Sequence, residues 1–260
     1  MRGRVVLITG ASSGIGAATA RAFSQAGAQV ALTARRADRL AALTAELGAA
    51  ALAIPADLAD PQAPAHVIAA AHARFGRVDI LFSNAGFGRR AWMEEQTAAE
   101  VAEQVCVNLT AAMELTRLVL PEMLARRHGH LIYMASLAGL VGVPTLSVYG
   151  AAKAGLCGFA EAVRREAAPR GVRVSVVAPG GVAGTEFRTR SDPAGAARVT
   201  TPDWLRPTAE QVAQAVVGLA RRPRRELSLP WPLGAAAWLG RRFPELADWL
   251  IINAFTRRAR

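Results

Sequence analysis

Tyr149 and Lys153 stand four residues apart in the segment SVYGAAKAGL, and Lys153 is the single lysine among 31 lysine and arginine residues. In a helix, residues four apart lie on the same face, so the two side chains are expected to be neighbours. A free tyrosine has a pKa of about 10 and is a poor acid or base near neutrality. A nearby cation favours the phenolate and lowers that pKa. The pair therefore predicts a tyrosine that exchanges a proton with a substrate beside a compact ammonium, which arginine would not replace.

The segment TGASSGIG, from Thr9 to Gly16, joins a short β-branched run to a helical pattern. Glycine at positions 10, 14 and 16 permits a tight turn and lets the backbone approach a pyrophosphate. The helix that begins here also favours an anion at its N-terminus. The spacing is G-x-x-x-G-x-G rather than the commoner G-x-G-x-x-G, but its place after the first strand predicts a dinucleotide site.

The second strand ends in LTARR, which puts Arg35 and Arg36 where NAD-binding sites commonly have an acidic residue for the ribose 2′-hydroxyl. The nearest acid, Asp38, already belongs to the next helix. Two guanidinium groups suit a 2′-phosphate, so the sequence favours NADP(H) as the cofactor. The alternative is that both are surface arginines of an arginine-rich chain.

Strand-like and helical segments alternate along the whole chain. Strands are expected at 4–8, 29–33, 51–56, 79–84, 130–136, 173–178 and 226–229. Helices are expected at 15–26, 37–47, 62–75, 97–127, 148–168 and 208–221. The alternation predicts an α/β fold of the Rossmann-type doubly wound class, with a seven-stranded parallel sheet and helices on both faces. Residues 1–230 are expected to form one domain, and residues 231–260 a C-terminal amphipathic appendage.

The net charge of +11 comes from arginines spread along the chain, without a zinc-finger, basic-zipper or RNA-binding motif, so no nucleic-acid partner is expected. Two cysteines, Cys106 and Cys157, form no metal-type pair and are expected to be reduced thiols of a cytoplasmic protein. The four histidines are scattered, are expected at the surface and indicate no metal site. No apolar run reaches about 18 residues, so no transmembrane helix is predicted.

Further motifs follow the glycine-rich segment in a recognisable order. They are Asp57-Leu58, Asn84-Ala85-Gly86, Asn108, Ser136, Tyr149 with Lys153, and Pro179-Gly180. In this order and at these spacings, they resemble the short-chain dehydrogenase/reductase family over residues 4–230. The segment PGGVAGT departs from the usual P-G-x-V-x-T of that family, because its threonine stands one position late.

The resemblance implies hydride transfer between a nicotinamide cofactor and a carbonyl or alcohol. In that reaction Tyr149 exchanges a proton with the substrate oxygen, Ser136 hydrogen-bonds the same oxygen, and Asn108 holds a water that links Lys153 to solvent. Tyr149 and Lys153 are also expected to contact the cofactor, together with Arg35 and Arg36. The remaining expected cofactor contacts are Thr9, Gly10, Ser12, Ser13, Gly14, Ile15, Gly16, Asp57, Leu58, Asn84, Ala85, Gly86, Pro179, Gly180, Val182 and Thr185.

The apolar segment LAGLVGVPTLSV lies between Ser136 and Tyr149 and carries no charge. In the family that it resembles, this segment borders the substrate. A lipophilic ketone, aldehyde or secondary alcohol is therefore expected, such as a steroid, fatty-chain or terpenoid compound. Phe87 and Trp92 are expected to add to the pocket, and residues 184–207 to form a lid over it.

The last 30 residues contain Trp231, Trp238 and Trp249, with flanking arginines. Leu246, Trp249, Leu250 and Asn253 fall at helical spacing. Two interpretations remain open: a helix that lies on an anionic membrane, or a segment that packs on its own or a partner subunit and covers the pocket. Members of the family are usually homodimers or homotetramers, formed through the segments that correspond to 97–127 and 148–168.

The sequence thus predicts an NADP(H)-dependent oxidoreductase that interconverts a lipophilic ketone or aldehyde and its alcohol, with Tyr149 as the acid and base. One alternative is a reductase of 3-oxoacyl thioesters, carried by acyl carrier protein or coenzyme A. The basic tail would attract an acidic carrier protein. An alternative of another class is a non-catalytic redox sensor that binds NADP(H).

Overall fold

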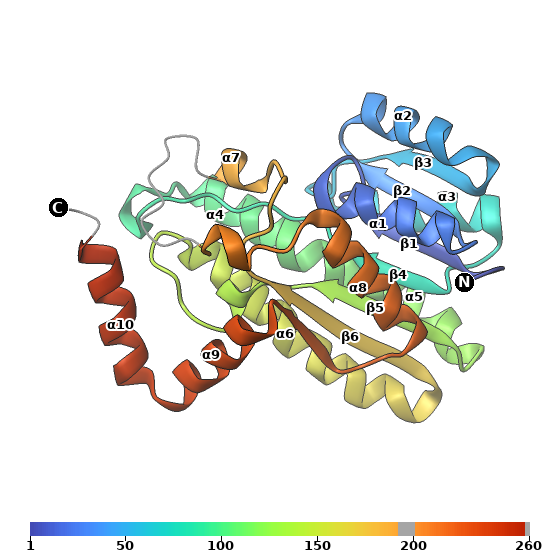
Figure 1. Cartoon of the computed structure of the whole chain (residues 1–260). Coiled ribbons are helices and arrows are strands. Elements are labelled where there is room, and N and C mark those ends of the chain that lie inside the picture. Colours follow the sequence, from blue (N-terminus) through green and yellow to red (C-terminus); the bar gives the residue numbers. More distant parts are fainter. Residues whose placement is uncertain (192–200, 258–260) are drawn as a thin grey trace.

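Seven strands pair in parallel in the order β3-β2-β1-β4-β5-β6-β7 (Figure 1). They are β1 (Val5–Thr9), β2 (Gln29–Ala34), β3 (Ala51–Pro55), β4 (Ile80–Ser83), β5 (Gly129–Met134), β6 (Val172–Pro179) and β7 (Glu226–Leu229). The structure is a computed structural model and describes residues 1–191 and 201–257. The sheet has the seven parallel strands that the sequence predicts, and the structure adds their order across the sheet.

Helices cover both faces of the sheet. They are α1 (Gly14–Gln25), α2 (Ala37–Leu47), α3 (Ala63–Phe75), α4 (Ala98–Val105), α5 (Ala111–Ala125), α6 (Ser147–Ala167), α7 (Phe187–Ser191), α8 (Ala209–Arg221), α9 (Trp231–Arg242) and α10 (Pro244–Arg257). The apolar faces of α1, α2 and α8 pack on one side of the sheet. Those of α3, α5 and α6 pack on the other side. The fold is therefore the doubly wound α/β class that was expected.

The strands are mostly apolar because both of their faces are covered. In β1, Leu7 points into the core layer of α3 and α5, while its neighbours Val6 and Ile8 point into the layer of α1 and α8. All three side chains are fully buried. This alternation is the period of two that an extended strand imposes on its side chains. It explains why the strands read as continuous apolar runs rather than as alternating ones.

The helix expected at 97–127 is not continuous. It divides into α4 and α5 around a π-helical turn over Cys106–Thr110. Within this turn, the Asn108 side chain donates through Nδ2 to the Gln104 carbonyl, 2.8 Å away, and to the Phe87 carbonyl, 2.7 Å away. A π turn inside an α-helix commonly marks a functional position. Here it holds the amide of a predicted catalytic residue against the loop that follows β4.

The chain after β7 forms two further helices, whereas the sequence indicated a helical pattern only around 246–253. Helix α9 packs against β7, and α10 turns away from the sheet at its end (Figure 1). Within the described ranges, no helix is both long and apolar enough to cross a membrane.

Candidate active site

The carboxyl ends of β1 and β4 form the floor of the site. The strand order changes direction between these two neighbours, and a doubly wound sheet opens a crevice at such a point. The Thr9 hydroxyl accepts hydrogen bonds from the backbone N–H groups of Asn84, at 2.9 Å, and Ala85, at 2.8 Å. The Asn84 amide returns a bond to the Thr9 carbonyl at 2.9 Å. These bonds hold the ends of β1 and β4 together beneath the crevice, so Thr9 supports the site from behind while Asn84 also lines it.

Two glycines of the TGASSGIG segment are required by close backbone contact. Gly10 has φ +66°, and a β-carbon there would lie 2.9 Å from the Cα of Ala85. A β-carbon at Gly16 would collide with the Gly10 carbonyl. Larger residues would push the loop away from β4 or away from α1. The glycines therefore keep the N-terminus of α1 close to the crevice, as a bound pyrophosphate requires.

One cavity of about 1040 Å³ runs along this edge of the sheet. Nearly all of the predicted cofactor and catalytic residues line it, although they come from the ends of six strands. The lining members are Gly10, Ser12, Ser13, Gly14, Ile15, Arg35, Arg36, Asp57, Leu58, Asn84, Ala85, Gly86, Ser136, Tyr149, Lys153, Pro179, Gly180, Val182 and Thr185. Thr9, Gly16 and Asn108 lie behind the cavity wall, where they hold the lining in place.

The two arginines after β2 are not equivalent. Arg36 lies on the glycine-rich loop, where its guanidinium donates to the Ser12 hydroxyl at 3.0 Å and the Ser13 hydroxyl at 2.6 Å. Arg35 is more than half exposed, and its guanidinium lies 3.9 Å from an Asp57 carboxylate oxygen. A fixed guanidinium is better prepared to bind an anion than one that must first be ordered. Arg36 is therefore the stronger candidate for contact with a phosphate.

A third arginine joins this group. Arg39 lies one turn into α2 and donates to a Glu186 carboxylate oxygen at 2.5 Å, while Arg36 donates to the other oxygen at 2.9 Å. No pattern in the sequence indicated either partner, because Arg39 and Glu186 are 147 positions apart. A carboxylate held by two guanidinium groups shows that this corner of the cavity accepts an anion. The residues present thus fit the phosphate groups of a dinucleotide.

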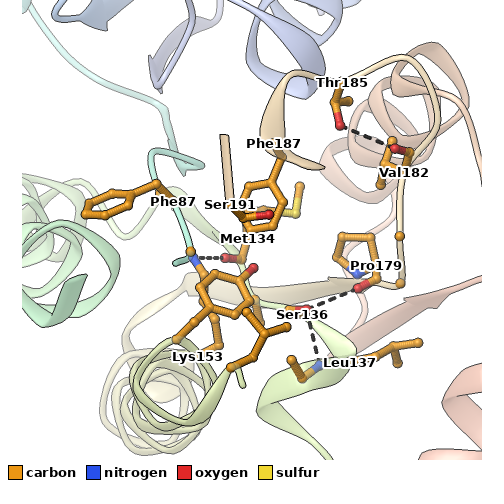
Figure 2. Close-up of a pocket in the computed structure, with 18 of the residues that line it drawn as sticks. Phe87, Met134, Ser136, Leu137, Lys153, Pro179, Val182, Thr185, Phe187 and Ser191 are labelled. Carbon is orange, nitrogen blue, oxygen red and sulfur yellow. Dashed lines mark hydrogen bonds between the residues drawn. The ribbon is translucent and has the colours of Figure 1, made fainter. Parts of the chain in front are cut away.

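Ser136, Tyr149 and Lys153 all line the cavity, and Figure 2 shows the positions of Ser136 and Lys153. Ser136 follows β5, and its hydroxyl lies 3.4 Å from the Pro179 carbonyl and accepts a bond from the Ala138 N–H at 3.2 Å. The Lys153 ammonium donates to the Met134 carbonyl at 2.8 Å. The same ammonium lies 5.8 Å from the centre of the Tyr149 ring. Helix α6 thus brings the tyrosine and the lysine to one face, as their spacing predicted.

Burial governs the acidity of this pair. It raises the pKa of Tyr149 to about 12, and the hydrogen bond with Ser136 offsets only part of this effect. Burial also lowers the pKa of Lys153 to about 8. The structure therefore does not show the lowering of the tyrosine pKa that the sequence predicted, because desolvation has the larger effect. A protonated tyrosine is the form that can donate a proton to a carbonyl oxygen.

Gly86 and Asn108 surround the lysine. A β-carbon at Gly86 would lie 2.5 Å from the Asn108 Oδ1 atom and 3.1 Å from the Lys153 Nζ atom. The Oδ1 atom is buried and has no hydrogen-bond partner among the described residues. A buried carbonyl oxygen normally finds a partner, which is often a water molecule. The geometry is compatible with the water that the sequence placed between Asn108 and Lys153.

The segment after β6, which departs from the family pattern in its sequence, forms a turn of its own. The Thr185 hydroxyl donates to the Val182 carbonyl at 3.3 Å and so closes its own turn (Figure 2). Its methyl group approaches the position that a β-carbon at Gly14 would occupy, at 3.3 Å. Both Val182 and Thr185 line the cavity, and their contact with a carboxamide stays a prediction.

Two apolar groups complete the wall. The Phe187 ring in α7 lies 5.4 Å from the Tyr149 ring, and no pattern in the sequence had singled it out. Helices α9 and α10 contribute small and apolar side chains to the far end of the cavity, among them Leu233, Leu239, Leu246, Leu250 and Ile251. Phe87 lines the cavity as expected. The expectation for Trp92 was wrong, because its side chain is about half exposed and lies outside the lining.

The lid expected at 184–207 is described only in part, because residues 192–200 lie outside the described residues. Of that range, Thr185, Glu186, Phe187, Ser191, Thr201, Pro202 and Arg206 line the cavity. Within the described ranges, no cluster of three or more histidine, cysteine or acidic side chains could hold a metal ion.

Comparison with known proteins agrees with this geometry. Residues 4–195 match the family model described as short chain dehydrogenase. The chain is 36% identical over 219 residues to the 3-oxoacyl-[acyl-carrier-protein] reductase FabG of Escherichia coli (strain K12), which covers 84% of this chain and 90% of that protein. A short-chain dehydrogenase from Streptomyces avermitilis superposes with a TM-score of 0.82 at 29% identity, over 96% of this chain and 97% of that one. A metagenomic short-chain oxidoreductase in complex with NADP gives a TM-score of 0.75 at 32% identity, over 88% and 97%.

Proposed function

This chain belongs to the short chain dehydrogenase family, and we propose that it uses NADP(H) to interconvert a lipophilic ketone or aldehyde and its alcohol. As a member it is an oxidoreductase that acts on CH–OH and C=O groups. The observation that carries the proposal is one continuous cavity. It extends from the arginines after β2, past Tyr149, to the apolar side chains of α10.

The choice of NADP(H) is supported by the arginines at one end of the cavity. Arg36 and Arg39 together hold the Glu186 carboxylate, so the two guanidinium groups are placed to bind an anion. A 2′-phosphate offers more charge and more acceptor oxygens than a carboxylate, and guanidinium groups bind it well. One of the solved relatives was crystallised with NADP.

The side chains around the middle of the cavity suit proton transfer to a carbonyl oxygen. NADP(H) supplies or accepts the hydride when it is bound. Tyr149, with its pKa raised to about 12, is protonated at neutral pH and can donate the proton. Ser136 can hold the substrate oxygen beside the tyrosine. Lys153 lies behind the ring and can return a proton through the water beside Asn108.

A lipophilic substrate is supported by the composition of the wall. From the Ser136–Tyr149 segment, Leu137, Val141, Val143 and Leu146 line the cavity, and α9 and α10 add further apolar side chains. Apolar walls with a few placed polar groups are typical of pockets for small lipophilic compounds. The carbonyl would lie at Tyr149, with the apolar body of the molecule directed toward α10.

Two alternatives remain as proposals. The 36% identity to a 3-oxoacyl-[acyl-carrier-protein] reductase favours an acyl thioester as the substrate. In that case the fatty chain would occupy the wall formed by α9 and α10. A non-catalytic sensor of NADP(H) is the second alternative, and it requires Tyr149 to have no role in turnover.

We also propose a role for the outer surface of the tail. Trp231, Trp238 and Trp249 are between 60% and 76% exposed and are not among the described residues that line the cavity. Tryptophan with neighbouring arginine is typical of a helix at a membrane–water interface. The tail would then cover the pocket with one side and lie on a lipid surface with the other. Assembly into a homodimer or homotetramer stays a prediction.

The decisive experiment measures the oxidation of NADPH at about 340 nm, the absorption band of reduced nicotinamide. The carbonyl panel contains steroid ketones, long-chain aldehydes, quinones and acetoacetyl thioesters. Turnover that is lost in Tyr149→Phe, with NADPH binding retained, supports the reductase and identifies the substrate class. Turnover that persists in Tyr149→Phe contradicts the proposed mechanism. Binding of NADPH without turnover on any member of the panel favours the sensor.

A further inference from the structure

One carboxylate connects the two ends of the proposed site. Glu186 accepts hydrogen bonds from Arg36 at 2.9 Å and from Arg39 at 2.5 Å. Arg36 is only about a quarter exposed and is held in place by the Ser12 and Ser13 hydroxyls. The pair of guanidinium groups is thus already assembled, and Glu186 occupies the position between them.

The same residue immediately precedes α7. The next residue, Phe187, places its ring 5.4 Å from the ring of Tyr149. At the other end of α7, the Ser191 carbonyl accepts a hydrogen bond from the Arg90 N–H at 2.7 Å. The short helix is therefore anchored at both ends, and the anchor at its N-terminus consists of the arginines proposed to bind the cofactor.

We propose that Glu186 occupies the 2′-phosphate position in the cofactor-free protein, and that the phosphate of NADP(H) displaces it and loosens the start of α7 from Tyr149. This inference rests on the proposed use of NADP(H). A phosphate group carries up to about two negative charges, so it binds two arginines more strongly than a carboxylate does. Two anions between the same guanidinium groups repel each other, which favours departure of the side chain.

The arrangement links the cofactor that binds to the access of a substrate to Tyr149, the proposed acid. NAD(H) has a neutral 2′-hydroxyl, which cannot replace a carboxylate between two guanidinium groups. Glu186 then stays in place, and Phe187 stays against Tyr149. The preference for NADP(H) over NAD(H) would then have two sources. The arginines would attract the 2′-phosphate, and NAD(H) would be unable to displace the Glu186 carboxylate.

Removal of the competing charge tests the first half of this inference. Dissociation constants of NADPH and NADH are measured by fluorescence titration for the wild type and Glu186→Gln. The matched control is Glu46→Gln, which also removes a carboxylate paired with an arginine, Arg21, at 2.7 Å, but on the outer side of α1 and α2. We expect NADPH to bind Glu186→Gln at least about fivefold more tightly, the lower end of usual coupling effects. The dissociation constant of NADH should change by less than about twofold in this variant. In Glu46→Gln, neither dissociation constant should change.

Hydrogen–deuterium exchange tests the second half. The probes are adenosine 2′-monophosphate and adenosine 5′-monophosphate, and the readout is amide exchange in peptides that cover residues 182–191. In the wild type, the 2′-phosphate should accelerate exchange in this segment, whereas the 5′-phosphate should not. In Glu186→Gln the segment should already exchange fast, and neither nucleotide should accelerate it further.

The outcomes separate this inference from the proposed function. Equal affinity of the wild type for NADPH and NADH overturns both. A wild type that prefers NADPH, with unchanged or weaker NADPH binding in Glu186→Gln, overturns only the competition. Slower or unchanged exchange in 182–191 with the 2′-phosphate overturns the loosening of α7.

Discussion

The Lys153 ammonium lies 5.8 Å from the centre of the Tyr149 ring and donates to the Met134 carbonyl, 2.8 Å away. The lysine is 2% exposed and the tyrosine 7%, so both lose most of their contact with water. Burial therefore moves their pKa values apart: that of the tyrosine rises to about 12, and that of the lysine falls to about 8. A buried lysine with a pKa near neutrality can release a proton and recover it, which an arginine cannot do.

Lys153→Arg is expected to retain the fold and lose most of the activity. The wider guanidinium cannot occupy the space between Gly86 and the Met134 carbonyl, and it does not release a proton near neutrality. We expect kcat to fall by about two orders of magnitude or more, the usual effect of removing a proton-transfer group. Steady-state kinetics of carbonyl reduction would measure the loss.

The pH dependence of kcat/KM distinguishes a role of Lys153 in proton transfer from a role in packing alone. In the wild type, kcat/KM for reduction should decline above about pH 8, because the lysine loses the proton that it passes on. Lys153→Arg should show a lower but flat profile through this range. A decline near pH 8 that persists in the arginine variant would assign it to another group.

Gly86→Ala should impair catalysis more than stability. The new methyl group would lie within 2.5 Å of the Asn108 Oδ1 atom and 3.1 Å of the Lys153 Nζ atom. It would displace the ammonium and any water between the two groups. Turnover should fall at least about tenfold, since small misplacements at an active site have large effects. Gly158→Ala is the matched control on α6, because its methyl group would meet no atom within 4 Å. Equal losses in both variants would contradict the assignment.

The sheet could be predicted because its signals are local. Each strand is a short apolar run between turn residues, as in Val5–Thr9, and every side chain of that strand is buried. The pair of Tyr149 and Lys153 was also readable, since helical spacing alone brings them together. The π turn at Asn108 could not be predicted. It depends on a hydrogen bond to the Phe87 carbonyl, which lies 21 positions earlier in the chain.

Other parts of the site depend on long-range contacts that leave no pattern in one sequence. Arg39 is one of many arginines, and only the folded chain brings it to Glu186. Phe187 is an isolated phenylalanine until α7 places it beside Tyr149. The spacing of apolar residues indicated a helix near 246–253, but it could not show which of them face a cavity.

His130 should make the fold sensitive to acid. The expectation that all four histidines lie at the surface was wrong, because His130 is 5% exposed in β5 and hydrogen-bonded to Ser175. Burial lowers its pKa from 6.5 to about 4. Between these values the unfolded chain binds a proton that the folded protein does not. The stabilisation is complete above pH 6.5 and is lost as the pH falls to 4, by roughly 3 kcal/mol in total.

Urea unfolding at pH 7 and pH 4.5 would measure this dependence. His130→Gln should show a smaller loss between the two values than the wild type, whatever its absolute stability. His66→Gln is the control, because its side chain is exposed. A wild type and a His130→Gln variant with the same pH dependence would show that other groups control the acid response.

The two sides of α10 should have different functions, one in binding the substrate and the other in contact with lipid. Both Leu250, at 53%, and Trp249, at 60%, are exposed, but of the two only Leu250 belongs to the described lining of the cavity. Leu250→Gln should raise KM for a long apolar carbonyl compound by roughly threefold to tenfold, because the bound compound would cover the exposed half of the leucine side chain. It should leave KM for a short carbonyl compound unchanged, because that molecule does not reach α10.

Trp249→Gln should have the opposite pattern. Its KM values should stay near those of the wild type, while sedimentation with vesicles of phosphatidylglycerol and phosphatidylcholine should decrease, because tryptophan contributes strongly to binding at a lipid interface. Wild-type protein that does not sediment with these vesicles would exclude the lipid contact and leave α10 only as a wall of the pocket. Equal effects of both substitutions on KM would instead mean that α10 turns both sides toward the substrate.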